Sequence, residues 1–220
     1  ITGGASRLNE ISTKINEESS KVGKYLQTLI NLQIVHKIYP FGENPQNSRK
    51  GIYHIADNCY DFWYSFIFPA KPEIESGNGD IIADNEVFGE KLSYYIGKPP
   101  FENICLQYLQ RKNRNKMLPF TATSFGSWWG TDPKEKTQTD FDVVAANRID
   151  KKIILGECKW KHRIDDVAEI QKLMSKEHLL SEYKDRYYYL FSKVTFTEKA
   201  KKLMSNKLVL ITADMLFENS

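Results

Sequence analysis

Three charged residues in the segment TDFDVVAANRIDKKIILGECKWK, residues 139–161, have types and a spacing that could do chemistry: Asp142, Glu157 and Lys159. Asp142 lies near the start of a predicted strand, and Glu157 and Lys159 stand two residues apart at the end of the next, which places both on one face. If the strands pair as a hairpin, Asp142 and Glu157 meet at one end. Adjacent carboxylates are the hard oxygen ligands that Mg²⁺ or Mn²⁺ prefers. Such an ion polarises a phosphodiester and activates water, while the lysine orients or deprotonates that water or neutralises charge on the phosphate.

Three neighbouring residues bear on the same site. Asp140 lies on the same face as Asp142 if the strand is regular, where it could assist the site or simply be solvated. Gly156 has no side chain to obstruct an approaching backbone. Cys158 should point to the opposite face from its two neighbours and belong to the core.

The segment resembles the PD-(D/E)xK nuclease superfamily, whose signature is an aspartate, a variable gap and then (D/E)-x-K. The resemblance implies an α-β-β-β-α-β core, with Asp142 and Glu157 as metal ligands and Lys159 serving the nucleophile or the transition state. The superfamily often adds an acidic residue from the preceding helix. Glu102 in PPFENIC is the candidate for that catalytic and metal-binding role. Phe141 stands where the signature has proline, a position at which proline varies widely.

These residues also have a structural interpretation. Asp142, Glu157 and Lys159 could be surface charges at strand ends, and a Glu157–Lys159 ion pair would add little stability. Glu102 could equally be an acid in the first turn of a helix, where it favours the helix dipole. Gln171, on the helix after the strand of Glu157, is a supporting candidate, because some members of the superfamily use a glutamine or lysine there to hold the site.

Other residues near the motif have two possible roles each. Trp128 and Trp129 could stack on bases, although packing against the core is favoured. The run RKNRNK, residues 111–116, could touch phosphates or could be a solvated helix end, where cations are favourable. Lys161 and Arg163 could extend a basic path beside the site.

The first part of the chain has its own pattern. Residues 6–35 predict two helices, because apolar residues recur at helical spacing in both. IVHKIYP then alternates as a strand, FGENPQNSRKG is a turn-rich loop and IYHIAD is a returning strand. This order is that of a winged helix-turn-helix, whose net charge over residues 1–70 is only +1. Side chains that could contact a DNA backbone are Lys14, Lys21, Lys24, Arg49 and Lys50.

The aromatic run DNCYDFWYSFIF, residues 57–68, is expected to be buried in a helix that docks the first domain onto the second. Prolines and the sequence ESGNGD mark a linker over residues 69–79. Helices and strands then alternate, which predicts an α/β unit with a mixed sheet. We therefore expect a winged helix-turn-helix over residues 1–68. A PD-(D/E)xK restriction-endonuclease-like α/β domain should follow over residues 80–220, for an α+β fold overall.

Composition excludes several classes of protein. The 220 residues include 31 basic and 28 acidic ones, a formal charge of +3 that suits a local nucleic-acid patch rather than a global field. Three cysteines without CxxC spacing and four scattered histidines argue against a disulfide framework and a zinc site. No apolar run approaches the roughly 20 residues of a membrane helix. No signal peptide is visible, so we expect a cytoplasmic protein without a membrane partner.

Nearly the whole chain resembles the C-terminal part of a family of archaeal and bacterial P-loop ATPases. The features that carry the resemblance, in order, are the winged helix, FWYSFIFP, FENIC, GSWWG, DFDVVA and GECKW. Those proteins have an N-terminal ATPase module of the AAA+/STAND type, then a winged helix, then a nuclease-like domain of poorly defined function. The resemblance implies that the ATPase module lies outside these residues, which contain no GxxxxGK[ST] phosphate loop and hence no nucleotide site.

These observations predict a nucleic-acid-processing module that carries out Mg²⁺- or Mn²⁺-dependent phosphodiester hydrolysis, on DNA rather than RNA, under control of the ATPase module. The alternative is a catalytically silent DNA-binding or protein-interaction module that regulates the ATPase, since many members of the superfamily have lost activity. A third interpretation is an oligomerisation domain, in which aromatic faces around Trp63 or Trp128 form a contact between copies of the chain.

Overall fold

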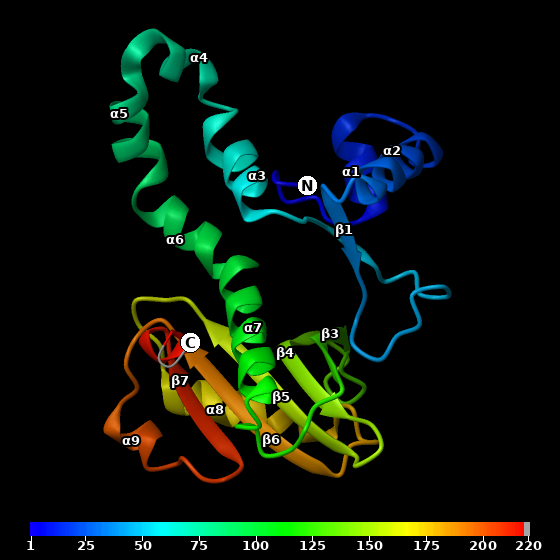
Figure 1. The fold of residues 1–220 in the computed structure, drawn as a ribbon, viewed down its shortest axis with the longest axis vertical. Coiled ribbons are helices and arrows are strands. Elements are labelled where there is room, and N and C mark those ends of the chain that lie inside the picture. Colours follow the sequence, from blue (N-terminus) through cyan, green and yellow to red (C-terminus); the bar gives the residue numbers. More distant parts are fainter. Residues whose placement is uncertain (218–220) are drawn as a thin grey trace. The chain divides into compact units, whose positions relative to one another are not determined.

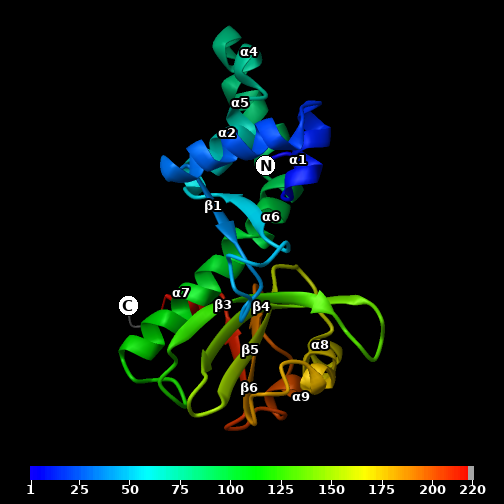
Figure 2. The same cartoon turned by 90° about the vertical axis from the view of Figure 1, so that its right-hand side faces the viewer.

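The computed structural model describes residues 1–217, which divide into two compact units, residues 1–92 and residues 93 onward (Figures 1 and 2). Each unit has its own hydrophobic core. The division falls after residue 92, whereas the sequence predicts that the second domain begins at residue 80. Within the described residues, no helix has the length and apolar character needed to cross a membrane.

The first unit begins with the predicted order of helix, helix, strand, loop and strand. The elements are α1 (Leu8–Ile15), α2 (Ser19–Asn31), β1 (Val35–Ile38) and β2 (Ile52–Ile55). The two strands pair antiparallel, as a hairpin with a long loop requires. Both helices turn their apolar faces onto this hairpin, and the buried cluster between them consists of Ala5, Ile11, Val22, Leu26, Val35 and Tyr53.

The aromatic run after β2 is helical, but the prediction that it is buried is wrong. It forms α3 (Asn58–Phe62) and the π-helical turn η1 (Trp63–Ile67). Tyr60 and Phe68 are more than half exposed, at 54% and 56%. Six aromatic residues within nine positions point to all sides of a helix, so no single contact face can cover them.

The segment predicted as an irregular linker, residues 69–79, is also helical. Pro72 is accommodated in the first turn of a short helix, where its missing N–H is not needed. Gly77 breaks the helical path with a φ of 92°, a conformation that glycine adopts without strain. The elements from here to the end of the first unit are α4 (Lys71–Glu73), η2 (Ile74–Asn78), α5 (Gly79–Ile82) and η3 (Ala83–Val87).

The second unit is built around a five-stranded mixed sheet of order β3-β4-β5-β6-β7. The first three strands pair antiparallel, and β6 and β7 are added in parallel. The strands are β3 (Ser124–Thr131), β4 (Gln138–Asn147), β5 (Lys152–Lys159), β6 (Asp185–Ser192) and β7 (Leu208–Thr212). The helices are α6 (Glu90–Gly97), which spans the division between the units, α7 (Pro100–Arg114), α8 (Asp166–Ser175) and α9 (Glu198–Lys201).

Helices cover both faces of this sheet. Helix α7 lies on one face, and α8 and α9 lie on the other (Figure 2). The core under α7 contains Phe101, Val143 and Phe191, which are at most 1% exposed. Residues 153–158 of β5 are all buried, because β5 is the central strand and has a helix on either side.

Candidate metal and phosphodiester site

The candidate site lies where β4 and β5 part. The ladder between the two strands ends at the pair Val143 and Gly156, so the next positions in this register are Asp142 and Glu157. The Asp142 carboxylate accepts a hydrogen bond from the main-chain N–H of Cys158, with a distance of 2.7 Å between Oδ2 and N. This bond holds the Asp142 carboxylate beside the end of β5.

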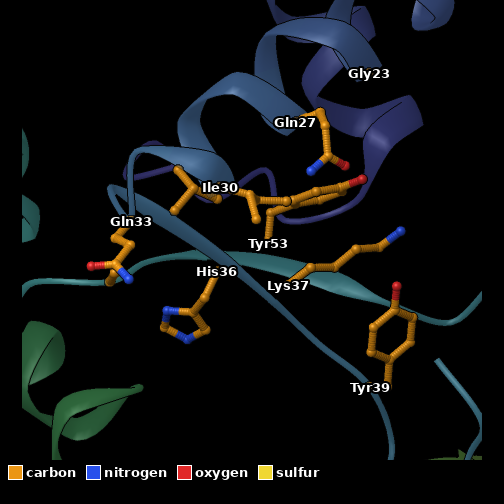
Figure 3. Close-up of a pocket in the computed structure, with 10 residues that line it drawn as sticks. Gly23, Gln27, Ile30, Gln33, His36, Lys37, Tyr39 and Tyr53 are labelled. Carbon is orange, nitrogen blue, oxygen red and sulfur yellow. The ribbon is translucent and has the colours of Figure 1, made fainter.

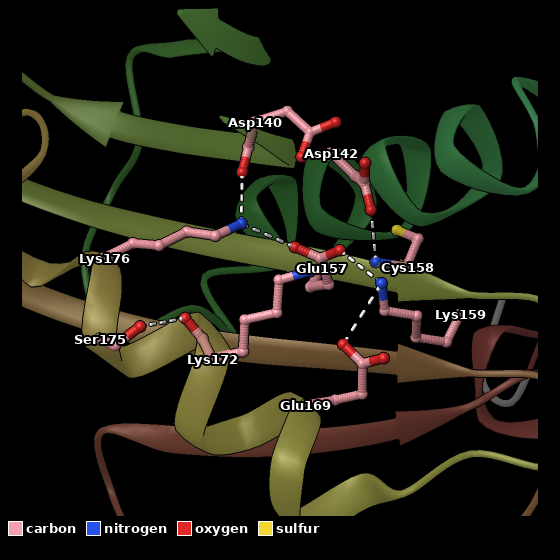
Figure 4. Close-up of polar contacts among 9 residues, drawn as sticks. All are labelled: Asp140, Asp142, Glu157, Cys158, Lys159, Glu169, Lys172, Ser175 and Lys176. Carbon is pink, nitrogen blue, oxygen red and sulfur yellow. Dashed lines mark hydrogen bonds and ion pairs between the residues drawn. The ribbon is translucent and has the colours of Figure 1, made fainter. Parts of the chain in front are cut away.

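Three carboxylates meet at this point (Figure 4). One oxygen from each of Asp140, Asp142 and Glu157 lies within 4.8 Å of the others. Asp142 and Glu157 are buried, at 8% and 6% exposure, whereas Asp140 is exposed and borders solvent. Two oxygens on one ion are separated by at most twice the metal–oxygen distance, about 4.2 Å for Mg²⁺. Small side-chain rotations would therefore bring this set onto a hard divalent cation, and the residues fit such an ion.

Two lysines bind the two oxygens of Glu157. Lys159 Nζ lies 2.6 Å from Oε1, and Lys176 Nζ lies 3.3 Å from Oε2. Lys159 also reaches the Glu169 carboxylate on α8, at 3.4 Å, and Lys176 donates to the main-chain carbonyl of Asp140, at 2.7 Å. The predicted trio of Asp142, Glu157 and Lys159 is thus brought together, with α8 and the turn that follows it supplying the outer partners.

The carboxyl groups of Asp142 and Glu157 have pKa values shifted in opposite directions. Burial raises the pKa of Asp142 to about 7, and the charge of Glu157 adds to this shift. For Glu157 burial acts in the same direction, but the ammonium groups of Lys159 and Lys176 outweigh it and lower the pKa. Glu157 is therefore the fixed negative charge of the cluster, while Asp142 exchanges a proton near neutrality unless a cation stabilises its carboxylate.

Glu102 lies in the first turn of α7 but is outside the group of three carboxylates within 4.8 Å. Burial, followed by repulsion from Asp142, raises the pKa of Glu102 to about 8. The side chain is thus near the cluster and protonated at neutral pH. Asp140, for which the sequence leaves both a supporting and a solvated role open, is the third carboxylate of the group within 4.8 Å.

Gly156 is needed for packing. An added Cβ would lie 3.2 Å from Val143 Cβ and 3.3 Å from a ring carbon of Phe191. The glycine therefore allows β4 and the Phe191 ring to approach β5, directly beside the first ligand residues of the site. Cys158 is buried on the α7 face, as predicted.

Exposed basic side chains lie on the two loops at the same end of the sheet. The β3–β4 loop ends where β4 begins, and β5 ends beside it because the two strands are antiparallel. Lys134 and Lys136 on the first loop and Lys161 and Arg163 after β5 are all exposed, as are the acidic Glu135 and Asp165 on the same loops. The basic groups are suited to contact a polyanion that approaches a cation bound by the carboxylates.

The other candidates divide into structural and solvent-exposed residues. Trp128 packs on Phe141, with ring centroids 5.8 Å apart, which favours its role in packing. Arg111 of the basic run donates to the Leu216 carbonyl at 2.7 Å, so its role is structural. Gln171 is exposed on α8. Lys176, five residues later, contacts Glu157.

The first unit contains a separate hollow of about 500 Å³ along α2 and β1 (Figure 3). Its lining is polar and aromatic: Lys37 Nζ lies 5.3 Å and 5.0 Å from the ring centroids of Tyr39 and Tyr53. Two of the basic residues predicted to contact DNA are already paired, Lys21 with Glu17 and Lys50 with Glu43, each at 2.7 Å.

Comparison with known proteins places part of this architecture in a family. Residues 63–178 match the DUF234 profile, described as archaeal and bacterial proteins of unknown function. The uncharacterized protein MJECL04 of Methanocaldococcus jannaschii is 32% identical over 197 residues, which cover 88% of this chain and 42% of that protein. The chain therefore spans less than half the length of this relative. Protein VC1899 of Vibrio cholerae, a solved structure, matches over 93% of this chain and 42% of its own, with 15% identity and a TM-score of 0.41.

Proposed function

Because the chain belongs to the DUF234 family of archaeal and bacterial proteins, whose function is unknown, we propose a function from the site itself. The chain is a nucleic-acid-processing module in which the second unit, a PD-(D/E)xK-like domain, hydrolyses phosphodiester bonds with Mg²⁺ or Mn²⁺. The first unit is a winged helix, and the preferred substrate is DNA.

One observation carries the proposal. Carboxylate oxygens of Asp140, Asp142 and Glu157 lie within 4.8 Å of one another, and Lys159 Nζ is 2.6 Å from the Glu157 carboxylate. Hard oxygen ligands for a divalent cation and an ammonium group thus meet at one solvent-accessible end of a sheet. The order of helix, three antiparallel strands, helix and parallel strand supports the superfamily assignment.

The residues of this chain divide the chemistry among them. Asp142, Glu157 and Asp140 would hold the ion, which when bound polarises the phosphodiester and lowers the pKa of water. Lys159 would orient the attacking water or stabilise charge on the phosphate. The Glu157 carboxylate is held in one place because Lys159 and Lys176 each contact one of its two oxygens.

The basic loops supply a path for the substrate. Lys134, Lys136, Lys161 and Arg163 stand on the two loops that flank the carboxylate cluster. Their charges would offset repulsion between the phosphates and the acidic centre, and binding through them should weaken as salt rises. Because these four side chains are assigned to phosphate contacts and not to base edges, we expect recognition of the nucleic-acid backbone without sequence preference.

A second candidate function is a catalytically silent module that binds DNA or protein and regulates the ATPase part of a longer chain. It is favoured by the fact that Lys159 is shared between Glu157 and Glu169, so the Glu157 carboxylate already has a cationic partner without a metal ion. The hollow along α2 and β1 would then be a docking place. In either case an N-terminal P-loop ATPase module is proposed for the full-length protein, because the chain resembles the C-terminal part of a family of P-loop ATPases.

The test is cleavage of a panel of labelled DNA and RNA, single- and double-stranded, with Mg²⁺, Mn²⁺ or chelator. Wild type is compared with Asp142→Asn and Lys159→Met, and with Lys199→Met as a control on an exposed position of α9. Cutting that requires metal, is abolished by the first two substitutions and survives the third supports the hydrolase.

If no cutting is observed, a second measurement, Mn²⁺ binding, tests whether the chain is a metal-dependent hydrolase. A chain that neither cuts nor binds Mn²⁺ through Asp142 is not a metal-dependent hydrolase, and the regulatory module becomes the better description. Titration of the same DNA panel against the silent chain at low and high salt then tests that module, since phosphate contacts weaken with salt.

A further inference from the structure

Lys176 is a buried cation that belongs to no motif. It opens the 3₁₀ turn η4 (Lys176–His178) after α8, and it is only 6% exposed. Burying an ammonium group is unfavourable unless protein partners replace its water. Its partners are the main-chain carbonyl of Asp140 at 2.7 Å, Glu157 Oε2 at 3.3 Å and the face of Phe141, whose centroid is 5.1 Å away.

These partners all belong to the carboxylate cluster or to its strand. Asp140 and Phe141 precede Asp142 on β4, and Glu157 is on β5. The ammonium group thus bridges the two strands at the point where their ladder has ended. Figure 4 shows it on the opposite side of Glu157 from Lys159.

The two lysines differ in how firmly they are held. Lys159 has only carboxylate partners, Glu157 and Glu169, and its side chain is 14% exposed. Lys176 is anchored to a main-chain carbonyl and its side chain is 7% exposed. Lys159 is therefore free to exchange one carboxylate partner for a substrate. Movement of the Lys176 ammonium group would break its hydrogen bonds to the Asp140 carbonyl and to Glu157.

We propose that Lys176 is a built-in counter-cation for the metal site: its ammonium group offsets part of the negative charge of the Asp140–Asp142–Glu157 cluster when no metal ion is bound, and it thereby limits divalent affinity. This inference rests on the proposed metal-dependent function. Lys176 acts through Glu157, so it is a positioning residue rather than a catalytic one.

Two consequences follow from Coulomb's law. An ammonium charge some 6 Å from a divalent ion disfavours that ion about tenfold even at the dielectric constant of water, so removing the charge should tighten Mn²⁺ binding about tenfold. In a variant without the Lys176 ammonium group, the buried Glu157 carboxylate loses one of its two cationic partners. It should unfold at a lower temperature in chelator and recover on addition of Mn²⁺ by mass action.

The experiment uses the 220-residue chain with Mn²⁺ as the probe. Free Mn²⁺ is titrated by its electron paramagnetic resonance signal, and thermal unfolding is followed in chelator and in Mn²⁺. The variants are Lys176→Met, which removes charge and hydrogen bond, Lys176→Gln, which retains a donor, and Lys176→Arg, which retains the charge. Lys199→Met, at an exposed position of α9, is the control.

The expected result is binding about tenfold tighter for the Lys176→Met and Lys176→Gln variants, with Lys176→Arg and Lys199→Met like wild type. If the Met variant does not fold, the Gln variant decides. Unchanged or weaker binding, or a fall in unfolding temperature that Mn²⁺ does not reverse, means that Lys176 only packs the structure, and the inference is overturned. If wild type and every variant fail to bind Mn²⁺, the metal-dependent function itself fails, and this inference fails with it.

Discussion

Asp142 takes over a hydrogen bond that the sheet itself no longer provides: its carboxylate accepts the N–H of Cys158 at 2.7 Å, directly beyond the last β4–β5 pair. The two strands can separate there without leaving a buried N–H unpaired, which would cost about 1–3 kcal/mol. The space opened by this separation is where the carboxylates converge. One side chain thus serves both the fold and the candidate site.

This relationship predicts the behaviour of the Cys158 amide. In Asp142→Ala the amide loses its acceptor, so its hydrogen exchange, measured by NMR, should accelerate. In Asp142→Asn the side-chain carbonyl can still accept, and exchange should remain slow. Equal exchange in wild type and Asp142→Ala would show that this hydrogen bond does not protect the strand.

Glu102 predicts a pH dependence of stability. Its pKa, raised to about 8 by burial and Asp142, lies above the unfolded value of 4.5. Folding therefore takes up a proton, and wild type should lose stability as the pH rises from about 4.5 to about 8. Glu102→Gln is always neutral, and at pH 7 it should be more stable than wild type by up to about 3 kcal/mol.

Urea unfolding of both proteins between pH 4 and 9 checks this expectation. The two free energies of unfolding should coincide near pH 4 and diverge as the pH rises. A difference that does not change with pH would mean that the Glu102 carboxyl titrates normally in the folded chain.

The third ligand of the metal site can be assigned by a pair of substitutions. Asp140 belongs to the group within 4.8 Å and Glu102 does not. Asp140→Asn should therefore weaken Mn²⁺ binding at least about tenfold, as loss of a ligand does, while Glu102→Gln should leave it within about twofold. Isothermal titration of both variants decides between them, and the reverse order would return Glu102 to the ligand set.

Two glycines predict opposite effects of the same change. Gly156→Ala puts a methyl group 3.2 Å from Val143 and 3.3 Å from Phe191, and it should destabilise the fold by about 1–3 kcal/mol. Gly23→Ala lies in α2 with nothing within 4 Å of the new atom, and it should stabilise the chain by up to about 1 kcal/mol. Chemical denaturation of both variants gives the two signs; a neutral Gly156→Ala would contradict the packing role.

Much of the site could be predicted because its residues are close in sequence. Asp142, Glu157 and Lys159 lie on adjacent strands, and the period of two fixes which face each side chain occupies. Whether Asp140 joins them depends on the path of β4 after its ladder ends, which the sequence pattern does not encode. Lys176 had no signal at all, since its contact with Glu157 depends on how α8 crosses the sheet.

The helical region between β2 and α6 differs from what the sequence predicts. The apolar character of residues 57–68 predicts burial, but Tyr60 and Phe68 are more than half exposed. Prolines and glycines predict an irregular linker, yet Pro72 fits a first helical turn. Composition gives the mean polarity of such a segment, whereas exposure depends on which neighbours the chain places beside it.

The mixed sheet has a consequence for the order of folding. Asp140, Asp142, Glu157 and Lys159 fall within 20 residues on one hairpin, β4–β5, whose closure entropy is small. The parallel partners β6 and β7 join only after long crossovers, which are slow to form. We expect the acidic residues to gather on the nascent hairpin before Lys176 arrives with the crossover. A divalent ion present during synthesis would then meet the site before its internal counter-cation does.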